Sequence, residues 1–215
     1  MRAPGAESPT PALNVKLLLF DLGGVLIDFS GPRELGQYLS YRSTPEEILQ
    51  RWVDCPHTTA FERGHISARD WADRFVRDWS ITLEPQEFLT VFRGMARSVL
   101  PGARELLAEL RPRFRLAALS NSNEIHWERN FKELRFLELF EFAVSSHQVG
   151  LCKPDPAIFQ VVLDRAQLPP AAVMFFDDLP ANVTAARSLG MHGRRVKGVD
   201  GIRASLIADG LIGAT

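Results

Sequence analysis

The segment 15–25 constrains the fold of this chain more than any other, because it joins a short apolar run to an aspartate and two glycines. Its sequence is VKLLLFDLGGV. A continuous apolar run of this length, bounded by glycine, is typical of a strand that is buried on both faces, as in a parallel sheet. Such a strand would deliver Asp21 to its carboxyl end, which is the edge where open α/β sheets bind ligands.

Four later apolar runs have the same character, and helical patterns separate most of them. Together with residues 16–20 they give five expected strands, the others lying at 115–119, 142–145, 173–176 and 194–196. Helices are expected to begin near Pro101, Pro156 and Pro180, since proline is favoured in the first turn of a helix. Strands that alternate with helices predict an α/β fold with a Rossmann-like three-layer core, in which helices cover both faces of a parallel sheet.

Residues 29–98 break this alternation, and they carry helix signals without a strand pattern. A capping box with proline at the first helical position begins at Thr44, Ser67 is a second expected N-cap, and Glu84 precedes a third helix. The aromatic residues of this segment repeat at helical spacing, which indicates packing in a core. Because the segment leaves the core directly after the Asp21 loop, we expect a helical cap over the strand ends, a position that suits a lid.

The expected organisation is therefore a core formed by 15–28 and 99–215, a cap at 29–98, and a mobile tail at 1–14. The tail contains three prolines together with glycine and serine, and it lacks the apolar segment of a signal peptide. The 215 residues are 46% hydrophobic and 24% charged, which suits one such core with an insertion.

Charge and cysteine usage restrict the partners and the compartment. A net charge of −1 argues against a nucleic-acid or anionic membrane surface, since both need a cationic field. No apolar stretch of the sequence approaches the roughly 20 residues that span a bilayer. Cys55 and Cys152 match no metal-binding spacing and favour idle thiols in a reducing cytosol. We expect a cytoplasmic protein, monomeric or homodimeric.

Polar residues follow four of the expected strand positions in chain order. They are Asp21, Ser120-Asn121, Lys153 and Asp177-Asp178. Three carboxylates near one point repel each other, and a hard divalent cation such as Mg²⁺ would allow them to be ionised together. A lysine and a hydroxyl beside them would form a cradle for a phosphoryl group. The pattern indicates a small phosphorylated metabolite as the ligand.

These residues resemble the four motifs of the haloacid dehalogenase-like hydrolase superfamily. The matching stretches are FDLGGV at 20–25, LSN at 119–121, GLCKPDP at 150–156, and FDD at 176–178 followed by Asn182. The resemblance covers the chain from about Val15 onward, and it places the expected cap where this family has its small helical cap.

The resemblance implies roles for the residues that would contact the phosphoryl group. Asp21 would be the nucleophile, forming an aspartyl-phosphate. Ser120 would bind the transferring phosphoryl oxygens together with the backbone amide of Asn121. Lys153 would stabilise the negative charge around Asp21 and the phosphoryl group.

The resemblance also implies a set of Mg²⁺ ligands. Asp21 and Asp178 would bind the metal directly, Asp177 directly or through water, and Gly23 through its backbone carbonyl. Asn182, one helical turn further on, is expected to orient Asp178, with a polar helix surface as the alternative.

Gly23 is the main departure from the family pattern. Many phosphatases of the family carry there an aspartate that protonates the leaving group and later activates water, and glycine lacks this side chain. A leaving group that needs less protonation would fit, so a sugar phosphate is the favoured substrate. The Asp-Leu-Gly motif and the FERGHIS stretch at 61–67 also resemble the branch of bacterial glucose-1-phosphate phosphatases, and the motif is shared with the phosphatase domain of soluble epoxide hydrolase.

Two other functions stay open. A 2-haloacid dehalogenase also lacks the second aspartate, but it needs no metal and no paired Asp177-Asp178. A weakly active or inactive protein of this fold would serve as a binding module. For the missing acid, our hypothesis is that His57 or His65 of the cap donates the proton, with a surface or capping role as the alternative for these residues and for His126.

Overall fold

The structure, a computed structural model, describes residues 13–213 of the chain. Nearly all of the tail expected at 1–14 lies outside these residues, and Leu13 already packs against the core. Within 13–213, no helix has the length and apolar character needed to cross a membrane.

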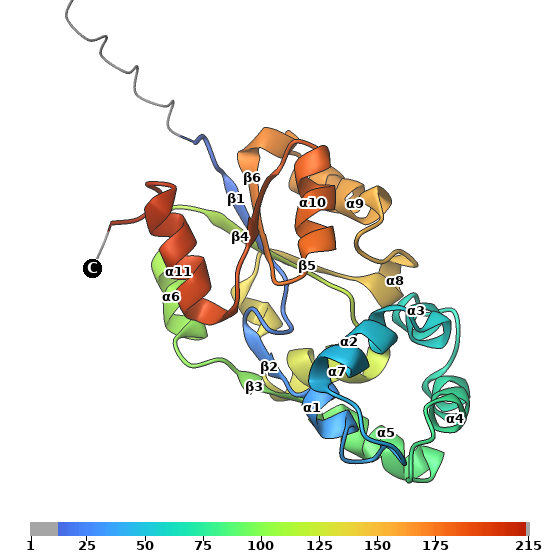
Figure 1. The fold of residues 1–215 in the computed structure, drawn as a ribbon. Helices are drawn as coiled ribbons and strands as arrows, with labels where there is room; N and C mark the ends of the chain where they lie inside the picture. The colour runs from blue at the N-terminus through green and yellow to red at the C-terminus, as the bar shows by residue number, and fades with distance from the viewer. Residues whose placement is uncertain (1–12, 214–215) are drawn as a thin grey trace, which may run out of the picture.

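Five parallel strands form the central sheet, as expected for an α/β fold (Figure 1). Their order across the sheet is β5, β4, β1, β6 and β7. The bounds are β1 Leu17–Phe20, β4 Arg115–Ser120, β5 Phe142–Ser145, β6 Val173–Asp177 and β7 His192–Arg195. Because β1 lies between β4 and β6, the carboxyl ends of these three strands meet at one edge.

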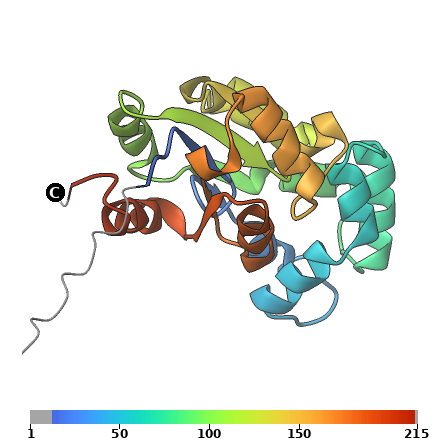
Figure 2. The same cartoon turned by 90° about the horizontal axis from the view of Figure 1, so that it is seen from above.

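Alternation of side chains along β1 builds two apolar layers. Leu18 and Phe20 belong to the layer that contains α6 (Ala103–Leu110) and α11 (Gly198–Ala208). Leu17 and Leu19 belong to the opposite layer, with α9 (Pro156–Ala166) and α10 (Pro180–Ser188). Figures 1 and 2 show these two helix pairs on the two sides of the sheet. The expected Rossmann-like three-layer core is confirmed.

Short helices complete the core around the strand ends. They are α7 (Glu124–Glu128), a π-helical turn (Arg129–Glu133), α8 (Ser146–Val149) and 3₁₀ turns at Leu137–Leu139 and Pro170–Ala172.

Five helices fill residues 31–94, which we call the helical insertion. They are α1 (Gly31–Leu35), α2 (Pro45–Val53), α3 (Pro56–Glu62), α4 (Ala68–Asp78) and α5 (Pro85–Gly94). The expected capping box at Thr44 and the N-cap at Ser67 both form. Aromatic side chains from these helices make a third apolar cluster, separate from the two layers of the core.

Two short strands correct the expectation that 29–98 contains helices only. β2 (Ile27–Phe29) and β3 (Ala96–Val99) pair in an antiparallel ribbon where the chain leaves and re-enters the core. Runs of three and four residues are too short to show a period, and only the return of the chain to its point of exit brings them together. We keep the division into a core and a cap as a proposal, with this ribbon as the connection.

The last strand is also displaced from its expected position. It covers His192–Arg195 instead of 194–196 and pairs only with β6 at the edge of the sheet. An edge strand is partly solvated, so its sequence, His-Gly-Arg-Arg, lacks the apolar run that locates buried strands.

The third cluster gives a stability prediction. The ring of Phe75 is fully buried and stacks on Trp79 and Phe88, with centroids 4.5 Å and 5.3 Å away. Replacing Phe75 by Ala should lower the free energy of unfolding by about 3–5 kcal/mol through lost burial and a cavity. Urea denaturation would measure this, and the exposed Arg74→Ala on the same helix should change it by no more than about 0.5 kcal/mol. A loss below about 1 kcal/mol for Phe75→Ala would contradict the packing described.

Candidate active site

The register of the central strands brings the expected site residues to one edge. Phe20 lies opposite Ala118 of β4 and Phe176 of β6, and the Asp21 amide donates a hydrogen bond of 2.9 Å to the Phe176 carbonyl. Asp21 is thereby level with Asp177, the last residue of β6. Ser120 ends the neighbouring strand β4 and is buried at the same edge.

The Lys153 ammonium group joins two of these strand ends. Its Nζ donates to Asp21 Oδ1 at 2.8 Å, to Asp177 Oδ2 at 2.7 Å and to the Leu119 carbonyl at 3.1 Å. The lysine side chain is 2% exposed. Burial by itself lowers the pKa of Lys153, but the charges of Asp177 and Asp21 and the hydrogen bonds to them outweigh it and raise the pKa above its ordinary value. The lysine is therefore a fixed cation.

Asn121 holds the backbone of Lys153 in place. Its side-chain Nδ2 donates to the Lys153 carbonyl at 2.9 Å, and its Oδ1 accepts from the Lys153 amide at 2.8 Å. From the motif alone, only the backbone amide of Asn121 is expected to have a role. The reciprocal pair of side-chain bonds links two loops that lie 32 residues apart, which no local pattern could reveal.

Asn182 binds Asp177 and not Asp178, which corrects the expectation. Its Nδ2 lies 3.0 Å from both carboxylate oxygens of Asp177. Asp177 also accepts from the Leu179 amide at 2.8 Å and from Lys153, and it is fully buried. The protein itself therefore supplies hydrogen bonds to both oxygens of Asp177, which suits a residue that positions Lys153.

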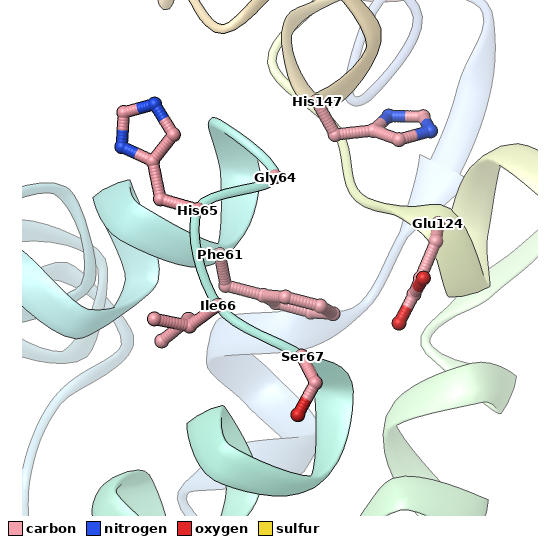
Figure 3. A pocket seen from close by; sticks show the side chains of 7 residues that line it. All are labelled: Phe61, Gly64, His65, Ile66, Ser67, Glu124 and His147. Carbon is pink, nitrogen blue, oxygen red and sulfur yellow. The ribbon is translucent and has the colours of Figure 1, made fainter.

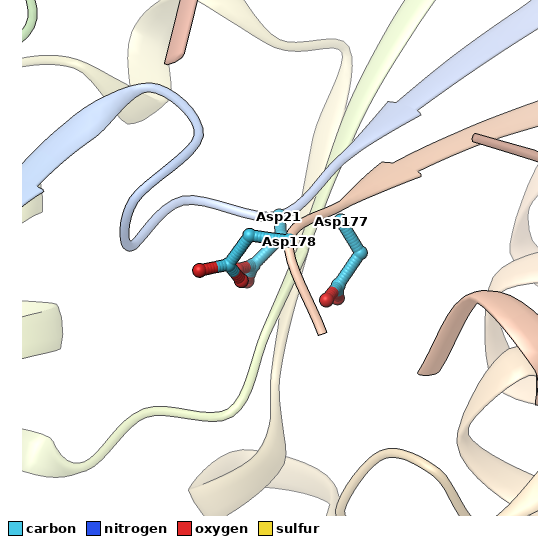
Figure 4. Close-up of side chains that lie close together, drawn as sticks. All are labelled: Asp21, Asp177 and Asp178. Carbon is cyan, nitrogen blue, oxygen red and sulfur yellow. The ribbon is translucent and has the colours of Figure 1, made fainter. Parts of the chain in front are cut away.

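Asp21 and Asp178 lie together, as Figure 4 shows, whereas the carboxylate of Asp177 points to a different side. One oxygen from each of the three carboxylates lies within 4.8 Å of the others. Burial, opposed by Lys153 and assisted by Asp177, raises the pKa of Asp21 to about 7. Burial and the charge of Asp177 also raise the pKa of Asp178.

This donor set fits a divalent cation. The Lys153 ammonium group pairs with two of the three carboxylates, Asp21 and Asp177, so the cluster carries excess negative charge when it is ionised. Hard oxygen ligands at this spacing are those that Mg²⁺ takes in proteins, and a cation there would favour the ionised form of Asp21.

Gly24 is a site residue that sequence analysis left without a role. Its φ of +73° is in the left-handed region, and a Cβ on it would lie 2.8 Å from Asp178 Oδ2. The second glycine of the first motif is thus required for the close approach of the Asp21 loop to Asp178. Two consecutive glycines, Gly23 and Gly24, indicate in the sequence that the backbone comes close to another group. Only the fold shows that this group is the carboxylate of Asp178.

His126 has a structural role in the packing of α7 on α5. It is buried, its Nε2 lies 2.7 Å from the Phe92 carbonyl, and its ring lies 4.1 Å from that of Phe92 between centroids. The carbonyl accepts, so Nε2 carries the proton, and Nδ1 faces Asn123 at 3.4 Å. Burial lowers the pKa of His126 to about 4. The ring therefore joins α7 to α5 in its neutral form.

The other histidines have different surroundings. His57 Nε2 lies 3.2 Å from Asp78 Oδ2, within the helical insertion. His147 lies in α8, and its Nδ1 is 2.6 Å from the Ser145 hydroxyl. A cavity of about 230 Å³ lies between the insertion and the core, and seven residues line it: Phe61, Gly64, His65, Ile66, Ser67, Glu124 and His147 (Figure 3).

Comparisons with known proteins place the chain among enzymes. A family model described as haloacid dehalogenase-like hydrolase matches residues 15–190. A phosphorylated carbohydrates phosphatase of Thermotoga maritima is 33% identical over 193 residues, covering 86% of this chain and 85% of that protein. A HAD family enzyme of Bacteroides thetaiotaomicron, solved in complex with magnesium and inorganic phosphate, superposes with a TM-score of 0.68 at 25% identity, covering 85% of this chain and 94% of that one.

Two further relatives are much longer proteins. The acyl-CoA dehydrogenase family member 10 of Mus musculus is 27% identical over 190 residues, and bifunctional epoxide hydrolase 2 of Rattus norvegicus is 44% identical over 52 residues. These matches cover 84% and 24% of this chain, but only 18% and 9% of the two relatives.

The ion-pair cluster gives a prediction for Lys153→Met. Removing the ammonium leaves Asp21 and Asp177 buried without their cation, so the free energy of unfolding at pH 7 should fall by about 3–5 kcal/mol. The deficit should shrink at pH 5, because the carboxylates then bind protons. Urea denaturation at both values would test this, with the exposed Lys132→Met, expected to cost at most about 1 kcal/mol, as the control. An equal deficit at both pH values would contradict it.

His126 gives a prediction for pH dependence. Its pKa is about 4 in the fold, whereas an unfolded histidine titrates near 6.5. The unfolded state therefore binds more protons between these values, so this contribution is complete above about pH 6.5 and is lost as the pH falls to about 4, amounting to about 3 kcal/mol. The difference in stability between the parent and His126→Gln should follow this course in urea denaturation. A difference that does not change with pH would overturn the assignment.

Proposed function

Because the chain belongs to the haloacid dehalogenase-like hydrolase family, we propose that it hydrolyses a small phosphate monoester with Asp21 as the nucleophile. The observation that carries the proposal is the cluster at the sheet edge. A buried carboxylate, Asp21, is bound to the fixed cation Lys153 and lies beside Asp178. The phosphatase relative that covers most of this chain supports the reaction class.

In this proposal Asp21 and Asp178 bind Mg²⁺ directly, with the backbone carbonyl of Gly23. Asp177 acts indirectly, by positioning Lys153, because its hydrogen bonds to Lys153 and Asn182 occupy its carboxylate. The metal would supply positive charge next to the phosphoryl oxygens. The donor set of the cluster supports this cofactor.

The residues of the chain divide the chemistry between them. A carboxylate oxygen of Asp21 attacks phosphorus, and the bond from phosphorus to the leaving oxygen breaks, which gives an aspartyl-phosphate. Water then attacks phosphorus, the bond to Asp21 breaks, and inorganic phosphate leaves. Lys153 offsets negative charge throughout, and the Ser120 hydroxyl with the Asn121 amide donates hydrogen bonds to the phosphoryl oxygens.

A sugar phosphate is the substrate class that we favour. The Thermotoga relative is named as a phosphatase of phosphorylated carbohydrates, which supports this choice. A sugar that is phosphorylated at its anomeric position has a leaving oxygen that needs less protonation, and such a substrate suits the absence of an acid side chain at Gly23. The dehalogenase alternative is disfavoured by the three clustered carboxylates, which halide displacement does not require.

Asp21→Asn tests the nucleophile. The amide cannot form the aspartyl-phosphate, so turnover of p-nitrophenyl phosphate and labelling of the protein by phosphate should both be lost, with thermal unfolding still cooperative. The exposed Asp164→Asn should keep the parent rate. Hydrolysis by Asp21→Asn at the parent rate would mean that the mechanism is wrong.

Chelation tests the metal. EDTA should abolish turnover of p-nitrophenyl phosphate by the parent protein, and added Mg²⁺ should restore it. Release of chloride from 2-chloropropionate in the presence of EDTA would point instead to the dehalogenase, and absence of all turnover would point to a binding module.

A further inference from the structure

We propose that Ser146, the first residue of α8, is a positioning residue for the phosphoryl group, because its hydroxyl fixes the loop that carries Ser120 and Asn121. The inference rests on the proposed function, in which the Ser120 hydroxyl and the Asn121 amide bind the phosphoryl oxygens. Ser146 lies outside the four motif stretches of the sequence. It acts through the loop and touches no substrate atom.

The hydroxyl of Ser146 binds both backbone groups of Ser122. The Ser122 amide donates to Ser146 Oγ at 2.9 Å, and Ser146 Oγ donates to the Ser122 carbonyl at 2.9 Å. Ser146 is fully buried, and Ser122 is 6% exposed. A hydroxyl has one proton to donate and lone pairs that accept, so both bonds form together. The hydrogen bonding of a buried peptide segment therefore depends on one side chain.

A second exchange joins the same two parts of the chain in the opposite direction. The Asn121 side chain binds the amide and the carbonyl of Lys153, at 2.8 Å and 2.9 Å. The segment after β4 thus gives a side chain to the Lys153 backbone, and the segment after β5 gives the Ser146 side chain to the Ser122 backbone. Four hydrogen bonds fasten the two segments together.

The proposed phosphate donors lie between fixed points. Ser120 is held in the sheet opposite Ser145 of β5, and Ser122 is held by Ser146. Within residues 13–213, the Asn121 amide between them has no hydrogen-bond acceptor. The Ser120 hydroxyl has one long contact, 3.4 Å, to the Asn121 carbonyl. Both donors are therefore available to an anion.

The direction of the Asn121 amide follows from the alternation along β4. The Arg115 amide points to β1, where it donates to the Lys16 carbonyl at 3.0 Å. Successive amides of a strand point to opposite neighbours, and Asn121 is an even number of residues further on. Its amide therefore points to the side of β1, which is the side of Asp21.

Loss of the Ser146 hydroxyl would leave the amide and the carbonyl of Ser122 buried without partners. Unpaired buried groups of this kind are costly, so the loop would move to find other partners. A movement at Ser122 turns the neighbouring Asn121 amide and disturbs its side-chain bonds to Lys153. Hydrogen-bond donors stabilise a reacting phosphoryl group only when they are held in place beforehand.

The proposed metal ligands lie on other strands, which gives the test its selectivity. Asp21 and Asp178 follow β1 and β6, whereas the loops that Ser146 joins follow β4 and β5. A change at Ser146 should therefore weaken the binding of phosphate and leave the binding of Mg²⁺ as it is.

Ser146→Ala tests the role with two readouts. The kcat/KM for p-nitrophenyl phosphate should fall about 10²-fold, as expected for a displacement of about 1 Å. The concentration of inorganic phosphate that raises the thermal unfolding temperature in the presence of Mg²⁺ should increase by about 10-fold or more. The rise in unfolding temperature caused by Mg²⁺ alone should equal that of the parent.

Ser145→Ala is the matched control. Ser145 is the neighbouring residue and is also fully buried, but its hydroxyl lies 2.6 Å from His147 Nδ1 and binds no backbone group of the Asn121 loop. This variant should lose thermal stability and keep the parent kcat/KM and phosphate affinity. Ser146→Cys, which keeps the volume and has a weaker hydrogen-bonding group, should fold and show an intermediate loss of phosphate affinity.

The outcomes separate this role from the proposed function. Parent values of kcat/KM and phosphate affinity in Ser146→Ala, or equal losses in Ser145→Ala, would overturn the role of Ser146. A loss of the Mg²⁺ effect together with the phosphate effect would also overturn it, because the whole site would then have changed. In each case hydrolysis by the parent leaves the phosphatase assignment in place. A parent protein that neither hydrolyses p-nitrophenyl phosphate nor is stabilised by phosphate would overturn both.

Discussion

The ammonium group of Lys153, held between Asp21 and Asp177, is the interaction on which the rest of the site depends. It neutralises two carboxylates that the sheet forces together, because parallel neighbours β1 and β6 end at the same level. Its own position is fixed by the side chain of Asn121, and that of Asp177 by Asn182. Buried charges are tolerated only when they are paired and hydrogen-bonded, and here Lys153 and Asp177 each have further bonds that orient them.

The helical insertion is joined to the core by packing. His126 of α7 bonds to the Phe92 carbonyl of α5, and the two rings lie 4.1 Å apart between centroids. Trp52 of α2 stacks on the same Phe92 ring, so the third apolar cluster reaches this contact.

Much of the fold followed from local patterns, and the errors have a common cause. Four strands were predicted within one residue of their ends. Three of them, β1, β4 and β6, lie inside the sheet and are apolar because they are buried, and the edge strand β5 is half buried but still begins with three apolar residues. The edge strand β7 and the ribbon of β2 and β3 have no such apolar run. Similarly, the motif residues could be named from the chain. The partner of Asn182 and the role of the Asn121 side chain depend on contacts that only the folded chain makes.

The sequence by itself determined the α/β class, the order of the motifs and the absence of a side chain at Gly23, since each of these is written in residue types and spacing. Only the tertiary structure decided which carboxylates bind Lys153, which of them binds Asn182, and why Gly24 must be glycine beside Asp178. The physical reason is that burial and Coulomb interactions depend on distances through space, which the register of the sheet and the packing of the insertion set.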